Sequence, residues 1–179
     1  MNFGFDLDKI FIDYPPFIPA RLIDRLYKQK SDGVLWYRIP SKPERFLRLI
    51  THYPLFRPPI FENIRFMQQI SRDKKHKHYL ISSRFSFLRA TTETLLKKYG
   101  LYSLFKDAFF NYKDKQPHLF KAAIIEKLNI HRYVDDDLPL LQFIAARNPK
   151  TKFFWLNSEK NEAFGKNLFS ITHLSQMFL

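Results

Sequence analysis

The chain has 179 residues, a length that suits one domain carrying at most a modest insert. Hydrophobic residues make up 45% and charged residues 26% of it, which excludes an intrinsically disordered chain. It contains no cysteine, so disulfides, thiolate catalysis and cysteine-ligated metal sites are excluded as well. The net charge of +13 favours anionic partners, whether phosphorylated metabolites, nucleic acid or an anionic membrane face.

The first residues lack the basic and apolar regions of a signal peptide. No run approaches the ~18 consecutive apolar residues that a membrane span requires. From these two observations we expect a soluble, cytoplasmic protein without a membrane span.

Short apolar runs predict six buried strands, namely Phe3–Leu7, His78–Ser82, Ala108–Tyr112, Arg132–Asp135, Lys152–Leu156 and Leu168–Thr172. Segments with helical periodicity lie between most of them, at Pro59–Ser71, Phe87–Tyr99, Pro117–Leu128 and Leu138–Arg147. Strands that are separated by single helices imply right-handed crossovers and a parallel sheet. The sequence therefore predicts an α/β fold with a doubly wound parallel sheet.

One stretch of about 45 residues, between the first strand and Pro59, interrupts this alternation and holds seven of the eleven prolines. A crossover needs only a dozen or so residues, so the stretch is interpreted as an insert. Two short helices are predicted inside it, at Ala20–Gln29 and Pro43–Thr51, the second behind a capping box that runs from Ser41 to Glu44. We expect residues 14–57 to form a small helical cap, and residues 1–13 and 58–179 to form the core.

Polar residues follow four of the predicted strands, and ligands bind beyond the carboxyl ends of strands in such a sheet. These segments are Asp6-Leu7-Asp8, Ser82-Ser83-Arg84, Lys113-Asp114-Lys115 and Asp135-Asp136-Asp137. Taken together, the carboxylates, hydroxyls and lysine suit an oxygen-ligated divalent cation and a phosphoryl group. Each segment alone has an ordinary alternative: the three aspartates suit a helix N-cap, and Lys115 suits an exposed surface.

The segment Phe5–Asp13 resembles the opening motif of haloacid dehalogenase (HAD) superfamily phosphatases, whose pattern is Asp-x-Asp-Gly-Thr. Tyr79–Arg84 resembles their second motif, an apolar strand that ends in serine or threonine. Lys115-Gln116-Pro117 resembles the third motif and Tyr133–Asp136 the fourth. All four occur in order over nearly the whole chain, with a Rossmann-like HAD core as the implied fold.

This resemblance implies a Mg²⁺-dependent phosphatase in which Asp6 attacks phosphorus and forms an aspartyl-phosphate. Asp8 would be the general acid and base, and Ser82 would bind a phosphoryl oxygen. Lys115 would offset the negative charge, with Lys121, one helical turn further along, as the runner-up. The implied metal ligands are Asp6, the backbone carbonyl of Asp8, Asp135 and Asp136. The expected substrate contacts are Ser83, Arg84 and Lys9.

Two residues depart from the opening motif: Lys9 replaces its glycine and Ile10 its threonine. Lys9 either reaches a substrate phosphate or points to solvent, and Ile10 has no hydroxyl to fix the loop. The substrate is expected to be a phosphorylated small molecule rather than a macromolecule. The alternative function is that of a weakly active or inactive HAD-like basic protein that binds nucleic acid or another polyanion.

Overall fold

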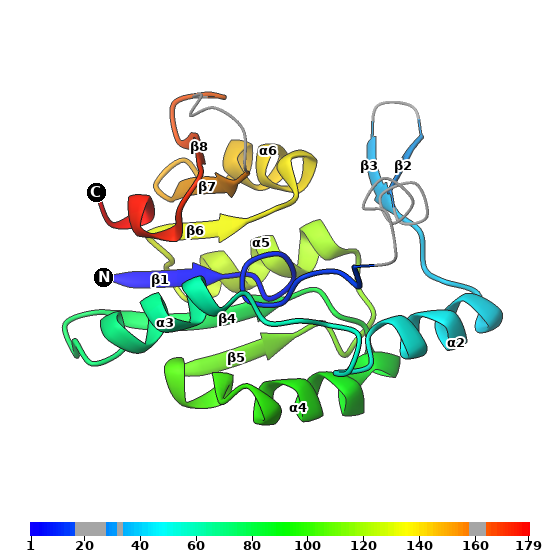
Figure 1. Cartoon of the computed structure of the whole chain (residues 1–179). Coiled ribbons are helices and arrows are strands. Elements are labelled where there is room, and N and C mark those ends of the chain that lie inside the picture. Colours follow the sequence, from blue (N-terminus) through cyan, green and yellow to red (C-terminus); the bar gives the residue numbers. More distant parts are fainter. Residues whose placement is uncertain (17–27, 32–33, 158–163) are drawn as a thin grey trace.

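The computed structural model describes residues 1–16, 28–31, 34–157 and 164–179. Within these residues a parallel six-stranded sheet has the order β5-β4-β1-β6-β7-β8 (Figure 1). Its strands are β1 (Asn2–Phe5), β4 (Lys77–Ser82), β5 (Asp107–Phe110), β6 (Arg132–Asp135), β7 (Lys152–Leu156) and β8 (Leu168–Ile171). All six predicted strands are confirmed, and the fold is the predicted doubly wound α/β architecture.

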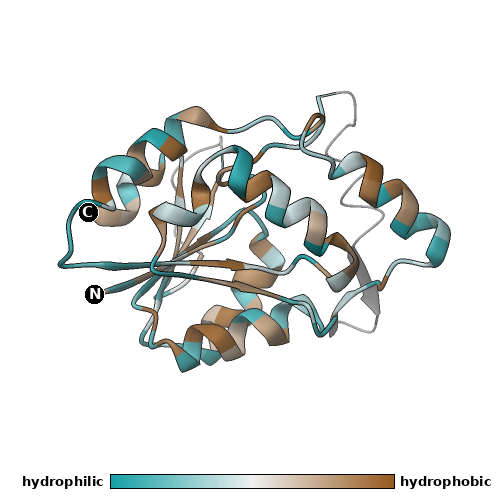
Figure 2. Ribbon diagram, turned by 90° about the horizontal axis from the view of Figure 1, so that it is seen from below, coloured by the Kyte–Doolittle hydropathy of each residue, from teal (hydrophilic) through white to brown (hydrophobic). Residues whose placement is uncertain are grey.

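Helices cover both faces of the sheet, which Figure 2 shows edge-on between them. On one face α3 (Phe61–Ile70) and α4 (Arg89–Lys98) contribute to one hydrophobic cluster. On the other face α5 (Pro117–Lys127) and α6 (Leu138–Arg147) contribute to a second cluster. The four predicted core helices are confirmed. Short 3-10 segments such as Leu174–Phe178 were not predicted, because one turn is too short to show a helical period.

Gly4 allows an aromatic side chain to pack closely against the central strand β1. A Cβ atom on Gly4 would lie 2.7 Å from Cδ2 of Tyr133, its partner on the neighbouring strand β6. Real side chains do not approach that closely, so any larger residue would push the tyrosine ring away. The Tyr133 hydroxyl donates a hydrogen bond to Oδ2 of Asp135 at 2.9 Å. Gly4 thus helps to position a carboxylate at the end of β6.

The loop after β1 accommodates both departures from the family motif. Lys9 has a φ of 61°, the left-handed conformation that glycine adopts most easily. The loop closes through backbone hydrogen bonds, from Lys9 N to the Ile12 carbonyl at 2.7 Å and from Phe11 N to the Leu7 carbonyl at 3.0 Å. The Ile10 side chain is fully buried, and its carbonyl accepts a bond of 2.7 Å from Nδ2 of Asn63. Asn63 and the backbone therefore fix this loop without a threonine hydroxyl.

The described part of the insert contains one helix, α2 (Lys42–Thr51), and one antiparallel hairpin of β2 (Lys28–Ser31) and β3 (Val34–Tyr37). The predicted helix Pro43–Thr51 is confirmed, and the backbone N–H of Ser41 donates to the Glu44 carboxylate at 2.7 Å. The predicted helix Ala20–Gln29 lies largely outside the described residues, and its last two residues belong to β2. The hairpin was not predicted.

The chain leaves and re-enters the core at neighbouring points. The N–H of Asp13 donates to the Pro58 carbonyl at 2.8 Å, and that of Ile60 donates to the Phe11 carbonyl at 2.8 Å. These bonds place the described insert over the carboxyl edge of the sheet. In the part of the chain that the structure describes, no helix combines the length and apolarity needed to cross a bilayer.

Candidate active site

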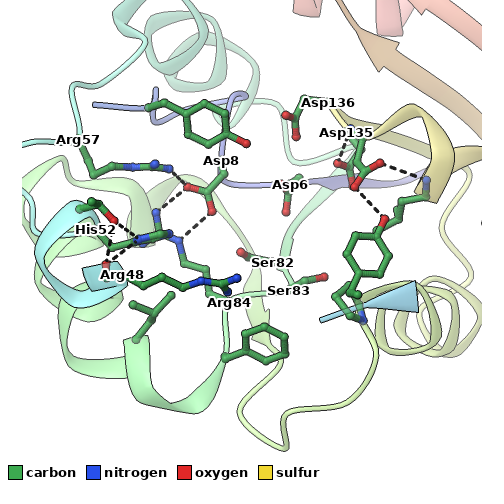
Figure 3. A pocket seen from close by; sticks show the side chains of 18 of the residues that line it. Asp6, Asp8, Arg48, His52, Arg57, Ser82, Ser83, Arg84, Asp135 and Asp136 are labelled. Carbon is green, nitrogen blue, oxygen red and sulfur yellow. Dashed lines mark hydrogen bonds and ion pairs between the residues drawn. The ribbon is translucent and has the colours of Figure 1, made fainter. Parts of the chain in front are cut away.

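The carboxyl ends of β1, β4 and β6 and the helix α2 enclose a pocket of about 440 Å³ (Figure 3). Most of the polar residues expected from the strand ends line it, namely Asp6, Asp8, Ser82, Ser83, Arg84, Asp135 and Asp136. The sheet topology brings them together because parallel neighbouring strands end at the same edge. Lys9 and Lys115, which were also expected here, are absent from the lining of this pocket.

Three carboxylates form a tight cluster on the pocket floor. One oxygen each of Asp6, Asp135 and Asp136 lies within 4.8 Å of the others. Burial, opposed by Lys121 and assisted by Asp135, raises the pKa of Asp6 to about 7. Burial and the two neighbouring carboxylates also raise the pKa of Asp136 well above its usual range. Carboxylates this close resist ionisation unless a cation compensates them.

The cluster fits a divalent cation such as Mg²⁺. Its donors are carboxylate oxygens, the ligands that hard divalent cations prefer. Oδ1 of Asp6 is buried, and the Lys121 ammonium lies 3.0 Å from it. The Asp136 carboxylate lies beside Asp6 in the pocket (Figure 3). Asp6, Asp135 and Asp136 are therefore the residues that would hold the metal.

The lysine beside this cluster is Lys121. Its Nζ lies 2.6 Å from Oδ2 of Asp135 and 3.0 Å from Oδ1 of Asp6, and the side chain is buried. Although burial alone would lower the pKa of Lys121, the two carboxylates hold it well above its usual range. Lys115 is exposed, and its backbone N–H donates to Oδ1 of Asn111. Lys115 was expected to approach Asp6, but Lys121 occupies that position instead.

The phase of helix α5 explains this difference. The helix begins at Pro117, so Lys115 lies in the loop before it. His118, Lys121 and Ile125 recur at intervals of three and four residues, and all three are buried on the same side of α5. This spacing was a usable signal in the sequence, but a lysine is normally assigned to the solvated side of a helix.

Asp8 is held between two buried arginines, as Figure 3 shows. Arg84 donates from Nη2 to Oδ1 at 2.7 Å and from Nε to Oδ2 at 2.9 Å. Arg57, at the end of the insert, donates to the same Oδ1. Burial alone would raise the pKa of Asp8, but the two guanidinium groups pull it well below its usual range. The Asp8 carboxylate is therefore ionised, and it lies outside the acidic cluster.

The three expected substrate contacts are placed differently from one another. The Arg84 guanidinium donates hydrogen bonds to the Asp8 carboxylate and to Oγ1 of Thr92. The Lys9 ammonium lies 2.7 Å from Oδ1 of Asp13, away from the pocket lining. The Ser83 hydroxyl lines the pocket, is buried, and has no hydrogen-bond partner among the described residues. Ser83 is thus the one of these three whose polar group has no hydrogen-bond partner among the described residues.

Helix α2 adds pocket residues that the sequence did not single out. Arg48 is buried in the pocket wall, and its carbonyl lies 2.8 Å from Nδ1 of His52. Burial, together with Arg57 and Arg84, lowers the pKa of His52 well below its usual range. The neutral imidazole therefore donates its Nδ1–H to that carbonyl. Nothing in the sequence distinguished Arg48 and Arg57 from the other cations of the insert.

No family model matches the sequence, and none of the curated proteins matches it. The fold is similar to that of a solved HAD family enzyme from Bacteroides thetaiotaomicron, described as a mutant with an aspartate replaced by alanine, in complex with magnesium and inorganic phosphate. The similarity has a TM-score of 0.50 at 13% sequence identity and covers 92% of this chain and 98% of that one. At this identity the likeness concerns architecture: the chain has a HAD-like, Rossmann-like fold.

Proposed function

We propose that this chain is a Mg²⁺-dependent phosphatase that hydrolyses a phosphomonoester through an aspartyl-phosphate on Asp6. The observation that carries the proposal is the cluster of Asp6, Asp135 and Asp136 within 4.8 Å, with the Lys121 ammonium against two of them. The cluster lies at the carboxyl edge of a parallel sheet, where this class of fold binds its ligands. The similar fold of an enzyme described with magnesium and phosphate supports the same chemistry.

Asp6, Lys121 and the two serines each have a separate role in the proposed hydrolysis. The Asp6 carboxylate attacks phosphorus, the bond from phosphorus to the alcohol oxygen breaks, and water then releases phosphate from Asp6. Lys121 favours the ionised form of Asp6 and offsets charge on the transferred group. The hydroxyls of Ser82 and Ser83 donate to phosphoryl oxygens. When bound, Mg²⁺ neutralises the charge that develops during transfer.

The role of Asp8 differs from the one that the family resemblance implies. A general acid must carry a proton, and the ion pairs with Arg57 and Arg84 keep the Asp8 carboxylate ionised. The leaving alcohol must then depart as an anion or take its proton from water. We therefore expect phenyl esters, whose leaving groups are acidic, to react faster than alkyl esters.

Hydrolysis of an aryl phosphate tests the proposal, with Mg²⁺ or a chelator, in the wild type, in Asp6→Asn and in Asp13→Asn. The wild type and Asp13→Asn should show Mg²⁺-dependent turnover, and Asp6→Asn should lose at least about a thousandfold in kcat. Unchanged turnover in Asp6→Asn would contradict a nucleophilic Asp6. A folded wild type that neither turns over nor binds Mg²⁺, but binds nucleic acid in a salt-dependent manner, would favour the basic binding protein instead.

A further inference from the structure

Helix α2 is amphipathic, but its apolar side faces solvent and its polar side faces the protein. Phe46 is 67% exposed and Leu47 55%, whereas Arg48 is 8% exposed. In most surface helices the apolar stripe is the side that is buried. We call the outward surface the α2 face; it consists of Phe46, Leu47, Leu49 and Ile50 with Tyr53 and Leu55 of the following turn, all exposed.

Contacts on the inner side keep the helix in this orientation. Nε of Arg45 donates to the Pro40 carbonyl at 3.0 Å, and its guanidinium lies 5.6 Å from the ring centroid of Phe87. The turn after the helix is tied to α4, because the Pro54 carbonyl accepts from Nζ of Lys98 at 3.2 Å. Rotating the apolar side inward would break these contacts and expose the buried Arg48. The exposure of the α2 face is therefore built into the fold.

The surroundings of the α2 face are basic. Residues 34–60 contain five cationic residues and a single acidic one, Glu44, and of the five only Arg48 and Arg57 are buried. Lys42 is exposed on α2 itself, and Lys97 and Lys98 are exposed on the neighbouring α4. Large exposed apolar surfaces mark contact sites, and apolar side chains flanked by cations match an anionic bilayer. A second copy of this chain would bring another net charge of +13 to the contact and oppose association.

The α2 face is continuous with the pocket. Leu47 is exposed on that face and also lines the pocket, while Arg48 of the next position lines it from the inside. Further apolar side chains in the pocket wall are Phe85, Leu88 and Leu140. In Figure 1 α2 lies at the outer edge of the molecule, and Figure 2 shows apolar residues along it. A molecule with a phosphate head and an apolar body would meet matching surfaces from the cluster outward.

We propose that the α2 face docks on an anionic lipid bilayer and that the substrate is an amphiphilic phosphomonoester drawn from that surface; the second half rests on the proposed phosphatase function. In the reaction, the phosphoryl group passes from the lipid oxygen to Asp6, and the lipid oxygen takes a proton from water and stays in the bilayer as an alcohol. Water then releases inorganic phosphate from Asp6. The apolar side chains of α2 enter the interface, and Lys42 and its neighbours contact the anionic headgroups.

Vesicle sedimentation tests the docking, with phosphatidylcholine vesicles that do or do not contain phosphatidylglycerol. The wild type should bind the anionic vesicles and be released by salt, and Phe46→Asp and Ile50→Asp should bind at least about tenfold more weakly. Leu119→Asp is the matched control, since Leu119 is 52% exposed on α5, and it should bind like the wild type.

Equal binding by Phe46→Asp and the wild type, or no binding to anionic vesicles, would overturn the docking. So would a dimer in solution that Phe46→Asp dissociates, because the α2 face would then be covered by a second copy. The substrate is tested with phosphatidic acid in vesicles and with a soluble aryl phosphate. Phe46→Asp should lower turnover of the first at least tenfold and leave the second unchanged. Failure of both substrates in the wild type would refute the phosphatase function, while the binding assay would still decide the docking.

Discussion

Lys115 and Lys121 stand six residues apart, and the second of them reaches the acidic cluster. Both were candidates in the sequence, and the choice depended on where helix α5 begins and which side it buries. The Lys121 ammonium contacts Asp6 and Asp135. Periodicity alone can predict where the strands end. The side of a helix on which a lysine lies depends on tertiary packing. Sequence patterns therefore predicted which strand ends line the pocket, and the lysine that contacts Asp6 in the structure is the runner-up, Lys121.

Lys121→Met should lower kcat for an aryl phosphate by about 10²–10³, because it removes the cation beside Asp6, the proposed nucleophile. Lys115→Met is the control and should leave kcat within about twofold, since its ammonium is exposed and outside the pocket lining. Steady-state kinetics on the two purified variants measures the difference. A large loss in Lys115→Met with little loss in Lys121→Met would reverse the assignment.

Asp8→Asn should destabilise the fold by about 3–5 kcal/mol, because it leaves two buried guanidinium groups without a carboxylate. Asp13→Asn removes a partly exposed pair with Lys9 and should cost less than about 1 kcal/mol. Urea denaturation of both variants gives the free energies of unfolding. Similar small losses in the two variants would show that the arginine pair does not stabilise the native state.

The raised pKa of Asp6 predicts a pH-dependent effect of Asp6→Asn on stability without metal. Because the folded pKa of about 7 lies above the unfolded value of 3.8, the native state binds more protons between these values. Ionisation of Asp6 therefore lowers stability progressively as pH rises through that window. Asp6→Asn should raise the melting temperature relative to the wild type at pH 8, and the difference should disappear near pH 4. A difference that is the same at both pH values would contradict the burial argument.

At the scale of elements, the strands and core helices were predictable because their apolar residues recur with the periods of strand and helix. The hairpin β2–β3 was not, since its residues show no alternation that separates it from a loop. The pocket residues of α2 were missed for a different reason. Its buried side carries Arg48 and its exposed side carries Phe46, so hydrophobicity pointed to the opposite orientation.

Gly4→Ala tests how the central strands position the site. The added Cβ would lie 2.7 Å from the Tyr133 ring, so the ring or the strand must move, at a cost of about 1–3 kcal/mol in the free energy of unfolding. The displaced hydroxyl would also weaken its hydrogen bond to Asp135. Urea denaturation measures the first effect. A variant as stable as the wild type would show that the close packing of Tyr133 on β1 is not required.

At the scale of the whole molecule, a parallel sheet collects carboxylates from β1 and β6, and an insert closes the pocket over them. The order of the motifs along the chain predicted this convergence, because parallel strands end at one edge. The two-arginine clamp on Asp8 was not predictable, since it joins Arg57 of the insert to Arg84 after β4 across the fold. The proposed phosphatase site does not account for the net charge of +13. We propose instead that cations around the α2 face bind an anionic bilayer.

Calorimetric titration of the metal-free protein with Mg²⁺ tests the central claim most directly, because every proposed step depends on the acidic cluster. The wild type and Asp13→Asn should each bind one Mg²⁺ per chain near pH 8. Asp136→Asn should bind at least about tenfold more weakly, since it removes a carboxylate ligand. If the folded wild type binds no Mg²⁺, or if Asp136→Asn binds it equally well, the cluster of Asp6, Asp135 and Asp136 is not the metal centre.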